Sequence, residues 1–345
     1  MKLIRPSSSI RLAFVVALVS LSVTACSSPT STSSGAYPPP AAEPATSPPL
    51  AKTPNGVVVP AGSGAEGVAF DPKTGTVAVG TSSGVLLFDT AGRLLHSVSL
   101  PAGPRHIALQ APGGPFLVPA QGADELAFVD PESGRVQALV RTGLWPHDVV
   151  AAEGRVFVGN ELGNSLSVIQ GTTVVATIPV VTQPGGLASV GGALAIVGVR
   201  ARRLELLGMS SLRPIAVVPA ESGPSHVVSY RSYLYVVDTG GGSLLVYATR
   251  PRLHQIDRVP LPGSPLGMVV DPVHRRLWIT LTALNALVEF NLSTPIPRRI
   301  ATFATVRQPN SVGVDPLTGT EYVAGEAAGV LQILGPRVIK GTTRS

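Results

Sequence analysis

The sequence predicts an all-β protein whose main domain is a seven-bladed β-propeller of four-stranded antiparallel blades. Two observations support this prediction: a short phrase occurs seven times along the chain, and successive copies begin 38 to 44 residues apart. A period of about 40 residues with four strands is typical of a propeller blade. The 37 glycines and 33 prolines supply turns between many short strands.

The recurring phrase consists of a proline or small residue, two variable residues and then an apolar strand. Its seven copies begin at Ala65, Pro104, Pro146, Pro184, Pro224, Pro265 and Pro309. Each copy joins the last strand of one unit to the first strand of the next. We therefore expect all seven copies to lie around the channel at one end of the ring.

The third unit shows how a repeat divides into four strands. Apolar segments at 148–151, 155–159, 165–169 and 174–179 are separated by turn residues. In the sixth unit, Trp278 lies within the second apolar segment, and we expect it to belong to the core.

The ring is predicted to close with strands from both ends of the domain. The seventh unit stops after its third strand, at 331–334, and an isolated apolar strand at 56–60 precedes the first unit. Placing the isolated strand in the last blade completes that blade and removes a free sheet edge. The propeller is therefore expected over residues 55–336, followed by a C-terminal tail at 337–345.

The N-terminal segment predicts export and membrane anchoring. Basic residues precede an apolar run that is shorter than the roughly 20 residues of a membrane span, as in a signal peptide. The run ends in Val23-Thr24-Ala25-Cys26, which resembles the lipobox of bacterial lipoproteins. This resemblance implies a signal peptide at 1–25. It also implies a lipid anchor at Cys26 that holds the chain on the extracytoplasmic side of a bacterial membrane.

Residues 26–54 consist mainly of Ser, Thr, Pro and Ala, which predicts a disordered tether. Cys26 is the one cysteine of the chain, so a disulfide within the chain is excluded. The formal charge is +6, and removal of the leader with its three basic residues leaves +3 (6 − 3). This modest charge, without a basic cluster, argues against nucleic acid as a partner.

The third unit also resembles a known family. Its segments 155–160 (RVFVGN) and 164–169 (NSLSVI) are similar to the repeats of YVTN/YncE-like β-propellers. The resemblance covers about 56–336 and implies the propeller fold. It implies no single function, because the family includes surface-layer repeats, periplasmic DNA-binding members and relatives of haem-bearing enzymes. The fourth unit departs from the pattern, with Ala-Arg-Arg at 201–203 in place of an Asn-containing loop.

Polar residues concentrate in the loops that are expected to surround one end of the channel. Three of the six histidines occupy the variable positions of the phrase. The candidate ligand-binding residues are Glu66, Arg105, His106, Trp145, His147, Asp148, Arg202, Arg203, His226 and Asn310. These residues fit two interpretations. They form a site in which His acts as a base or metal ligand, or they bridge neighbouring blades through hydrogen bonds.

The absence of a catalytic or metal-binding motif at fixed spacing favours a binding protein without metal or cofactor. We therefore predict a binding or scaffold module for a protein, glycan, small molecule or envelope ligand. The alternative is a propeller enzyme, resembling metal-dependent lyases or lactonase-like hydrolases. Convergence of His106, His147 and His226 within about 5 Å on an open pocket would favour the enzyme. Hydrogen bonds from each of them to a neighbouring blade's backbone would favour the scaffold.

Overall fold

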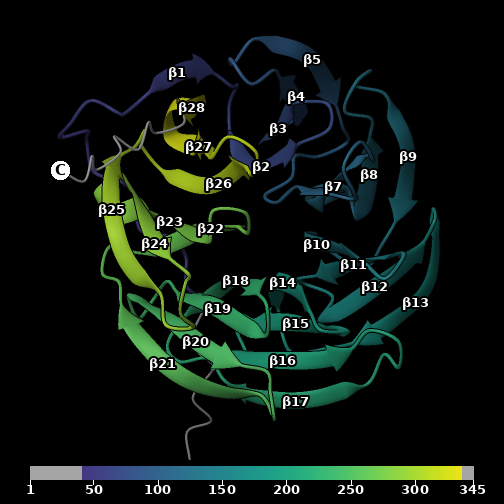
Figure 1. The fold of residues 1–345 in the computed structure, drawn as a ribbon. Coiled ribbons are helices and arrows are strands. Elements are labelled where there is room, and N and C mark those ends of the chain that lie inside the picture. The colour runs from purple at the N-terminus through teal and green to yellow at the C-terminus, as the bar shows by residue number, and fades with distance from the viewer. Residues whose placement is uncertain (1–40, 336–345) are drawn as a thin grey trace, which may run out of the picture. The chain divides into compact units, whose positions relative to one another are not determined.

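The computed structural model describes residues 41–335, which form a ring of seven four-stranded antiparallel sheets (Figure 1). The predicted fold class is confirmed. In each blade we name the strand nearest the axis of the ring strand a and the outermost strand d. The predicted signal peptide 1–25, Cys26 and the tail 337–345 lie outside the described residues.

The first three blades follow one another along the chain. Blade 1 consists of β2 (Glu66–Asp71), β3 (Thr76–Thr81), β4 (Gly84–Phe88) and β5 (Leu94–Ser99). Blade 2 consists of β6 (Ala108–Leu109), β7 (Phe116–Ala120), β8 (Glu125–Val129) and β9 (Val136–Arg141). Blade 3 consists of β10 (Pro146–Ala152), β11 (Arg155–Asn160), β12 (Ser165–Gln170) and β13 (Thr173–Pro179). The strands predicted for this third unit are confirmed to within two residues at each end.

The next three blades repeat this order. Blade 4 consists of β14 (Pro184–Val190), β15 (Ala193–Gly198), β16 (Arg203–Gly208) and β17 (Pro214–Pro219). Blade 5 consists of β18 (Pro224–Tyr230), β19 (Tyr233–Asp238), β20 (Ser243–Ala248) and β21 (His254–Pro260). Blade 6 consists of β22 (Pro265–Asp271), β23 (Arg276–Leu281), β24 (Ala286–Asn291) and β25 (Arg298–Ala304).

Blade 7 closes the ring as predicted, with strands from both ends of the domain. It consists of β26 (Pro309–Asp315), β27 (Thr320–Gly325), β28 (Val330–Leu334) and β1 (Val57–Pro60). Strand β1 pairs antiparallel with β28, and Val57 lies opposite Ile333. This pairing covers the backbone edge of β28, which would otherwise be free to pair with another chain.

Three short 3₁₀ helices lie in loops between strands b and c. They are η1 (Gln121–Ala123), η2 (Thr282–Leu284) and η3 (Glu326–Ala328). No helix within residues 41–335 is long and apolar enough to cross a membrane.

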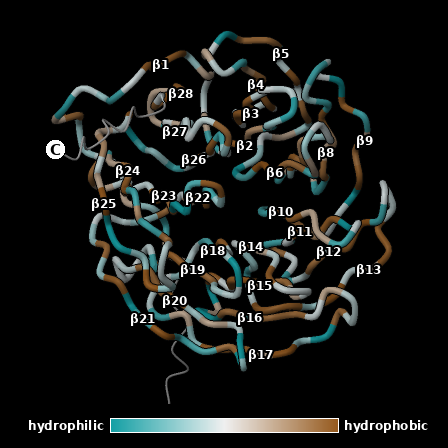
Figure 2. The backbone as a smooth tube through the Cα atoms, viewed as in Figure 1, coloured by the Kyte–Doolittle hydropathy of each residue, from teal (hydrophilic) through white to brown (hydrophobic). Residues whose placement is uncertain are grey.

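The core lies between adjacent blades. Phe157 and Leu166 of blade 3, for example, pack in one fully buried cluster with Leu194 and Ile196 of blade 4. Figure 2 shows hydrophobic stretches in every blade of the ring. Trp278 is 3% exposed, which confirms its predicted place in the core. Each blade therefore buries apolar surface only when its neighbours are present, and this makes the closed ring the stable unit.

Residues 41–54, which we call the strap, lie on the propeller although their composition predicted disorder. Ser47 is buried, its N–H donates to Gln308 Oε1 at 2.8 Å, and its hydroxyl donates to the Thr282 carbonyl at 2.6 Å. Asn285 Nδ2 donates to the Pro48 carbonyl at 2.9 Å. These partners lie more than 200 residues away in sequence, so a composition-based prediction does not include them. The strap is held by the polar groups of the loops and not by a core of its own.

Candidate ligand-binding site at the mouth of the channel

The recurring phrases meet around the axis at one end of the ring. In six of the seven blades the pairing between strands a and b shifts register within or just after the phrase, as between Glu66 and Val68 or between Pro146 and Asp148. Such bulges redirect side chains and are common beside functional sites. They explain how residues in the loops before strands a come to face the axis.

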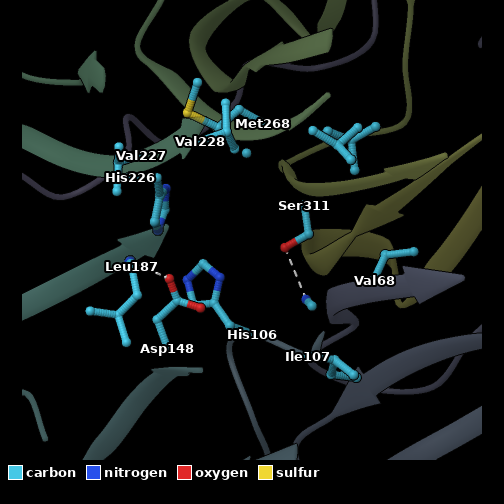
Figure 3. Close-up of a pocket in the computed structure, with 14 residues that line it drawn as sticks. Val68, His106, Ile107, Asp148, Leu187, His226, Val227, Val228, Met268 and Ser311 are labelled. Atoms are coloured by element: carbon cyan, nitrogen blue, oxygen red, sulfur yellow. Dashed lines mark hydrogen bonds between the residues drawn. The ribbon is translucent and has the colours of Figure 1, made fainter. Parts of the chain in front are cut away.

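A cavity of about 200 Å³ lies inside the ring of a strands. Its walls include apolar side chains such as Leu187 and Met268, and His106, His226 and Asp148 also line it (Figure 3). We call the end of the cavity where these three polar residues lie the mouth. The mouth therefore combines an apolar chamber with a few polar groups, which is typical of small-ligand sites.

Three histidines converge at the mouth, and we call them the histidine triad. They are His106 of the loop before β6, His147 of β10 and His226 of β18, and one nitrogen of each lies within 4.8 Å of the others. The ring centroids of His106 lie 4.8 Å from His147 and 4.6 Å from His226. Blades 2, 3 and 5 thus bring together residues that are 41 and 79 positions apart (147 − 106 and 226 − 147).

Two members of the triad have polar partners at Nδ1. His226 Nδ1 lies 3.1 Å from the Leu266 carbonyl, which can only accept a hydrogen bond. His147 Nδ1 lies 3.1 Å from Glu161 Oε2, an acceptor, and 2.7 Å from Gln121 Nε2, a donor. Desolvation alone would raise the pKa of Glu161, but the hydrogen bond and charge of His147 lower it to about 2. Glu161 is therefore an ionised carboxylate that lies beside His147 Nδ1.

Burial keeps the imidazoles of His106 and His226 uncharged. Desolvation, followed by the charges of the neighbouring histidines, lowers the pKa of His106 well below its usual range. Desolvation and the charge of His147 lower the pKa of His226 to about 3. Both rings are therefore neutral at pH 7, with a lone pair on one nitrogen.

Asp148 lies beside the triad and also links two blades. Its carboxylate accepts hydrogen bonds from the backbone N–H of Leu187 in blade 4, at 2.7 Å, and from its neighbour Val149, at 2.8 Å. Desolvation outweighs these bonds and raises the pKa of Asp148 to about 6. The Asp148 carboxyl therefore exchanges its proton close to neutral pH. Its bond to Leu187 also bridges blades 3 and 4, as expected if the polar residues of the loops join neighbouring blades.

A second polar cluster borders the mouth at blades 1, 2 and 7. Arg105 Nε lies 3.3 Å from both carboxylate oxygens of Glu66. Asn310 Nδ2 donates to Glu66 Oε1 at 3.3 Å and to Glu326 Oε2 at 2.8 Å. Desolvation raises the pKa of Glu66, against the lowering effect of Arg105. The structure thus brings together three of the predicted residues, Glu66, Arg105 and Asn310.

The strap passes beside this second cluster. Glu43, Pro44 and Thr46 line an open groove of about 520 Å³ together with Arg105 and Glu326. Glu43 is also close enough to Arg105 to act on its charge. The strap and the mouth therefore lie on the same face of the propeller.

The remaining predicted residues are not part of these clusters. Trp145 is 37% exposed near the mouth, and its backbone N–H donates to Asp124 Oδ1 at 2.8 Å. Arg202 lies in the turn before β16 and Arg203 is the first residue of that strand, and neither lines the cavity or the groove. The sequence analysis missed Gln121 and Glu43. The only sequence signal for Gln121 was its place in a loop between strands b and c, and Glu43 had none.

Comparisons with known proteins support the fold. Neither a protein-family model nor a curated protein matches the chain. Solved structures of propeller proteins do match the chain. Hydrazine synthase of Kuenenia stuttgartiensis is 17% identical, with a TM-score of 0.71 over 80% of this chain and 96% of that chain. A streptogramin B lyase structure is 12% identical, with a TM-score of 0.67 over 81% and 96% of the two chains.

A putative 6-phosphogluconolactonase from Bacteroides uniformis is 17% identical, with a TM-score of 0.64 over 75% of this chain and 90% of that chain. The described chain is therefore a seven-bladed β-propeller with propeller proteins of varied roles as structural neighbours. Identities of this size show a shared fold and carry no information on the ligand.

Proposed function

We propose that this chain is an exported, lipid-anchored binding propeller that takes its ligand at the mouth of the channel. The observation that supports this proposal most is the convergence of buried charged and imidazole groups from five blades on one cavity mouth. Desolvated polar groups of this kind are uncommon away from functional sites. The ligand classes that fit an anchored module are an envelope protein or glycan.

The position of the strap supports a site that faces the membrane. The strap, whose first described residue is Ala41, lies along the same face as the mouth. Ala41 is fifteen positions after Cys26 (41 − 26), and an extended chain of that length spans at most about 50 Å. If Cys26 carries the lipid, Ala41 stays within this distance of the membrane surface, which favours a ligand of the cell envelope.

Site-specific photo-crosslinking in intact cells tests the proposal. A benzophenone amino acid at Trp145, near the mouth, is expected to give a discrete adduct, whereas the same probe at the exposed Val175 of outer strand β13 is not. Arg105→Ala should abolish the Trp145 adduct, because it removes a charge at the mouth. Arg258→Ala, which breaks an exposed ion pair with Glu221, is the matched control. Equal adducts at both probe positions would contradict the proposal.

An enzymatic role is the second candidate, and the convergence of the triad within 4.8 Å is the observation that favours it. Asp148, with its pKa raised to about 6, lines the same cavity and is suited to accept or release a proton near neutral pH. A lactone and streptogramin B serve as trial substrates, because two solved propellers with this fold are named for acting on them. Ring opening of a lactone or of streptogramin B by the wild type, lost in Asp148→Asn, would support this role. Absence of turnover by the wild type would remove it.

A further inference from the structure

We infer that His106, His147 and His226 form a mononuclear site for Zn²⁺, with one coordination position open toward the central cavity. This inference goes beyond the proposed function and does not depend on it. The first argument is geometry: three imidazole nitrogens from three blades lie within 4.8 Å of one another. In a tetrahedral Zn²⁺ site with Zn–N bonds of 2.0–2.1 Å the nitrogens lie about 3.3 Å apart. The longest separation therefore has to shorten by about 1.5 Å, which small side-chain rotations supply.

The second argument is the set of groups behind the histidines. A metal-bound histidine usually donates its other N–H to a carboxylate or a backbone carbonyl, which fixes the tautomer and the ring orientation. His147 Nδ1 has the Glu161 carboxylate as its partner, and His226 Nδ1 has the Leu266 carbonyl. In His226 this leaves Nε2 with a free lone pair, because a carbonyl can only accept. His147 Nδ1 also contacts the amide nitrogen of Gln121, and one of its two ring nitrogens carries a lone pair in either neutral tautomer.

The third argument is that blade-to-blade bridging does not account for the triad. Bridging explains one nitrogen of His226, which bonds to the backbone of blade 6. It does not explain His106, for which neither ring nitrogen has a hydrogen-bond partner among residues 41–335. Its nitrogens are not among the fully buried atoms without a partner, and His106 lines the cavity, so they are accessible to an ion there. A bound cation would give His106 a partner together with one nitrogen of each of the other two rings.

The fourth argument is charge. Around the triad the carboxyl groups of Glu66, Asp148, Glu161 and Glu326 outnumber the guanidinium of Arg105. An excess of negative charge next to imidazole ligands favours a divalent cation. Imidazole ligands select Zn²⁺ and its transition-metal neighbours over Mg²⁺ and Ca²⁺, which prefer oxygen.

The open position follows from where the cavity lies. His106 and His226 line the cavity of about 200 Å³, whereas His147 does not. Three protein ligands plus a free fourth position are typical of catalytic zinc sites, and four protein ligands are typical of structural ones. We expect this fourth position to bind a water molecule or an oxygen atom of a small ligand in the cavity.

Metal titration of the full chain tests the inference. The protein is purified in detergent without a polyhistidine tag, stripped with a chelator, and titrated with Zn²⁺ and with Co²⁺ as a spectroscopic probe. We expect one ion per chain and Co²⁺ visible bands of nitrogen-ligated, four-coordinate metal. His106→Ala should weaken Zn²⁺ binding at least 100-fold. Glu161→Gln, which alters a positioning residue, should weaken it 10- to 100-fold.

His254→Ala is the matched control, since His254 is exposed on outer strand β21 and should leave the affinity unchanged. Unchanged affinity in His106→Ala would overturn the inference, as would Ca²⁺ or Mg²⁺ binding as tightly as Zn²⁺. If a variant fails to fold, the wild-type stoichiometry and Co²⁺ spectrum decide, because a wild type that binds no Co²⁺ also overturns it. The photo-crosslinking at Trp145 has a separate readout, so each proposal can fail alone.

Discussion

Replacing Ser47 by Ala is expected to release the strap from the propeller without unfolding the blades. The Ser47 hydroxyl donates to the Thr282 carbonyl at 2.6 Å and accepts from the Gln308 N–H at 2.9 Å, and both bonds are buried. The substitution leaves the Gln308 N–H buried without this partner. Thr282 keeps only a weak contact at 3.5 Å from the Asn285 N–H.

The magnitude follows from the two lost bonds. Each contributes about 1 kcal/mol net, and a buried group left unsatisfied costs about 1–3 kcal/mol. A loss of about 2 kcal/mol in the docking of the strap corresponds to an opening equilibrium about 30 times larger.

Hydrogen exchange measured by mass spectrometry on peptides from 41–54 reads this equilibrium directly. The amides of Ala45 and Ser47 are bonded to Ser264 Oγ and Gln308 Oε1, so they report opening of the strap. We expect their exchange to be about 30 times faster in Ser47→Ala, with amides of the core strands unchanged. Thr46→Ala, at an exposed neighbouring position, is the matched control. Equal exchange rates in the two variants would refute the assignment of these bonds as the strap's attachment.

Three further predictions test other parts of the molecule. Burial raises the pKa of Glu205, so the folded chain holds the carboxyl proton more tightly than the unfolded chain does. The stability of the wild type relative to Glu205→Gln should therefore fall as the pH rises above 4.5, the ordinary pKa of this group. Denaturant unfolding should therefore find Glu205→Gln equal to wild type near pH 4 and more stable at pH 7; parallel pH profiles would contradict this. Cys26→Ala should move the protein from the membrane pellet to the soluble fraction of exported protein, and continued sedimentation would argue against the lipid anchor. Gln332→Ala should lower the free energy of unfolding by about 2–4 kcal/mol, because Gln332 accepts from the Val306 N–H and donates to the Asn55 and Ala304 carbonyls; a loss below 0.5 kcal/mol would show that these bonds do not hold blade 7 to blade 6.

The fold was predictable from the sequence because each blade repeats the same local signals. Apolar segments set the strands, and Pro, Gly and Asp set the turns, so the third unit was predicted to within two residues. Blade 2 differs most: β6 has only the two residues Ala108–Leu109. Most of the shortening is at the start of the strand: strands a of blades 3 to 7 begin at the proline of the phrase, whereas β6 begins four residues after Pro104.

The site was predictable only in part, because its contacts join residues that are far apart in sequence. The phrase placed His106, His147 and His226 at one end of the ring, but the spacing of a repeat cannot show which side chains meet. Their approach depends on bulges in the a strands and on the order of the blades around the axis. The strap was beyond prediction for a related reason. The composition of the strap shows only that it has too little apolar surface to fold by itself. Its bonds to Thr282 and Gln308 form only when the propeller has folded.

Blade 4 shows why the triad can form at all. This blade lies between those of His147 and His226, and its phrase carries Gly185 and Gly186 where the neighbouring blades carry larger side chains. A Cβ atom added to Gly186 would come within 2.9 Å of the His226 Cα and of the Ser225 carbonyl oxygen. Any larger residue there would displace the backbone that positions His226. The lack of a side chain at Gly186 is therefore a condition for the position of His226 in the triad.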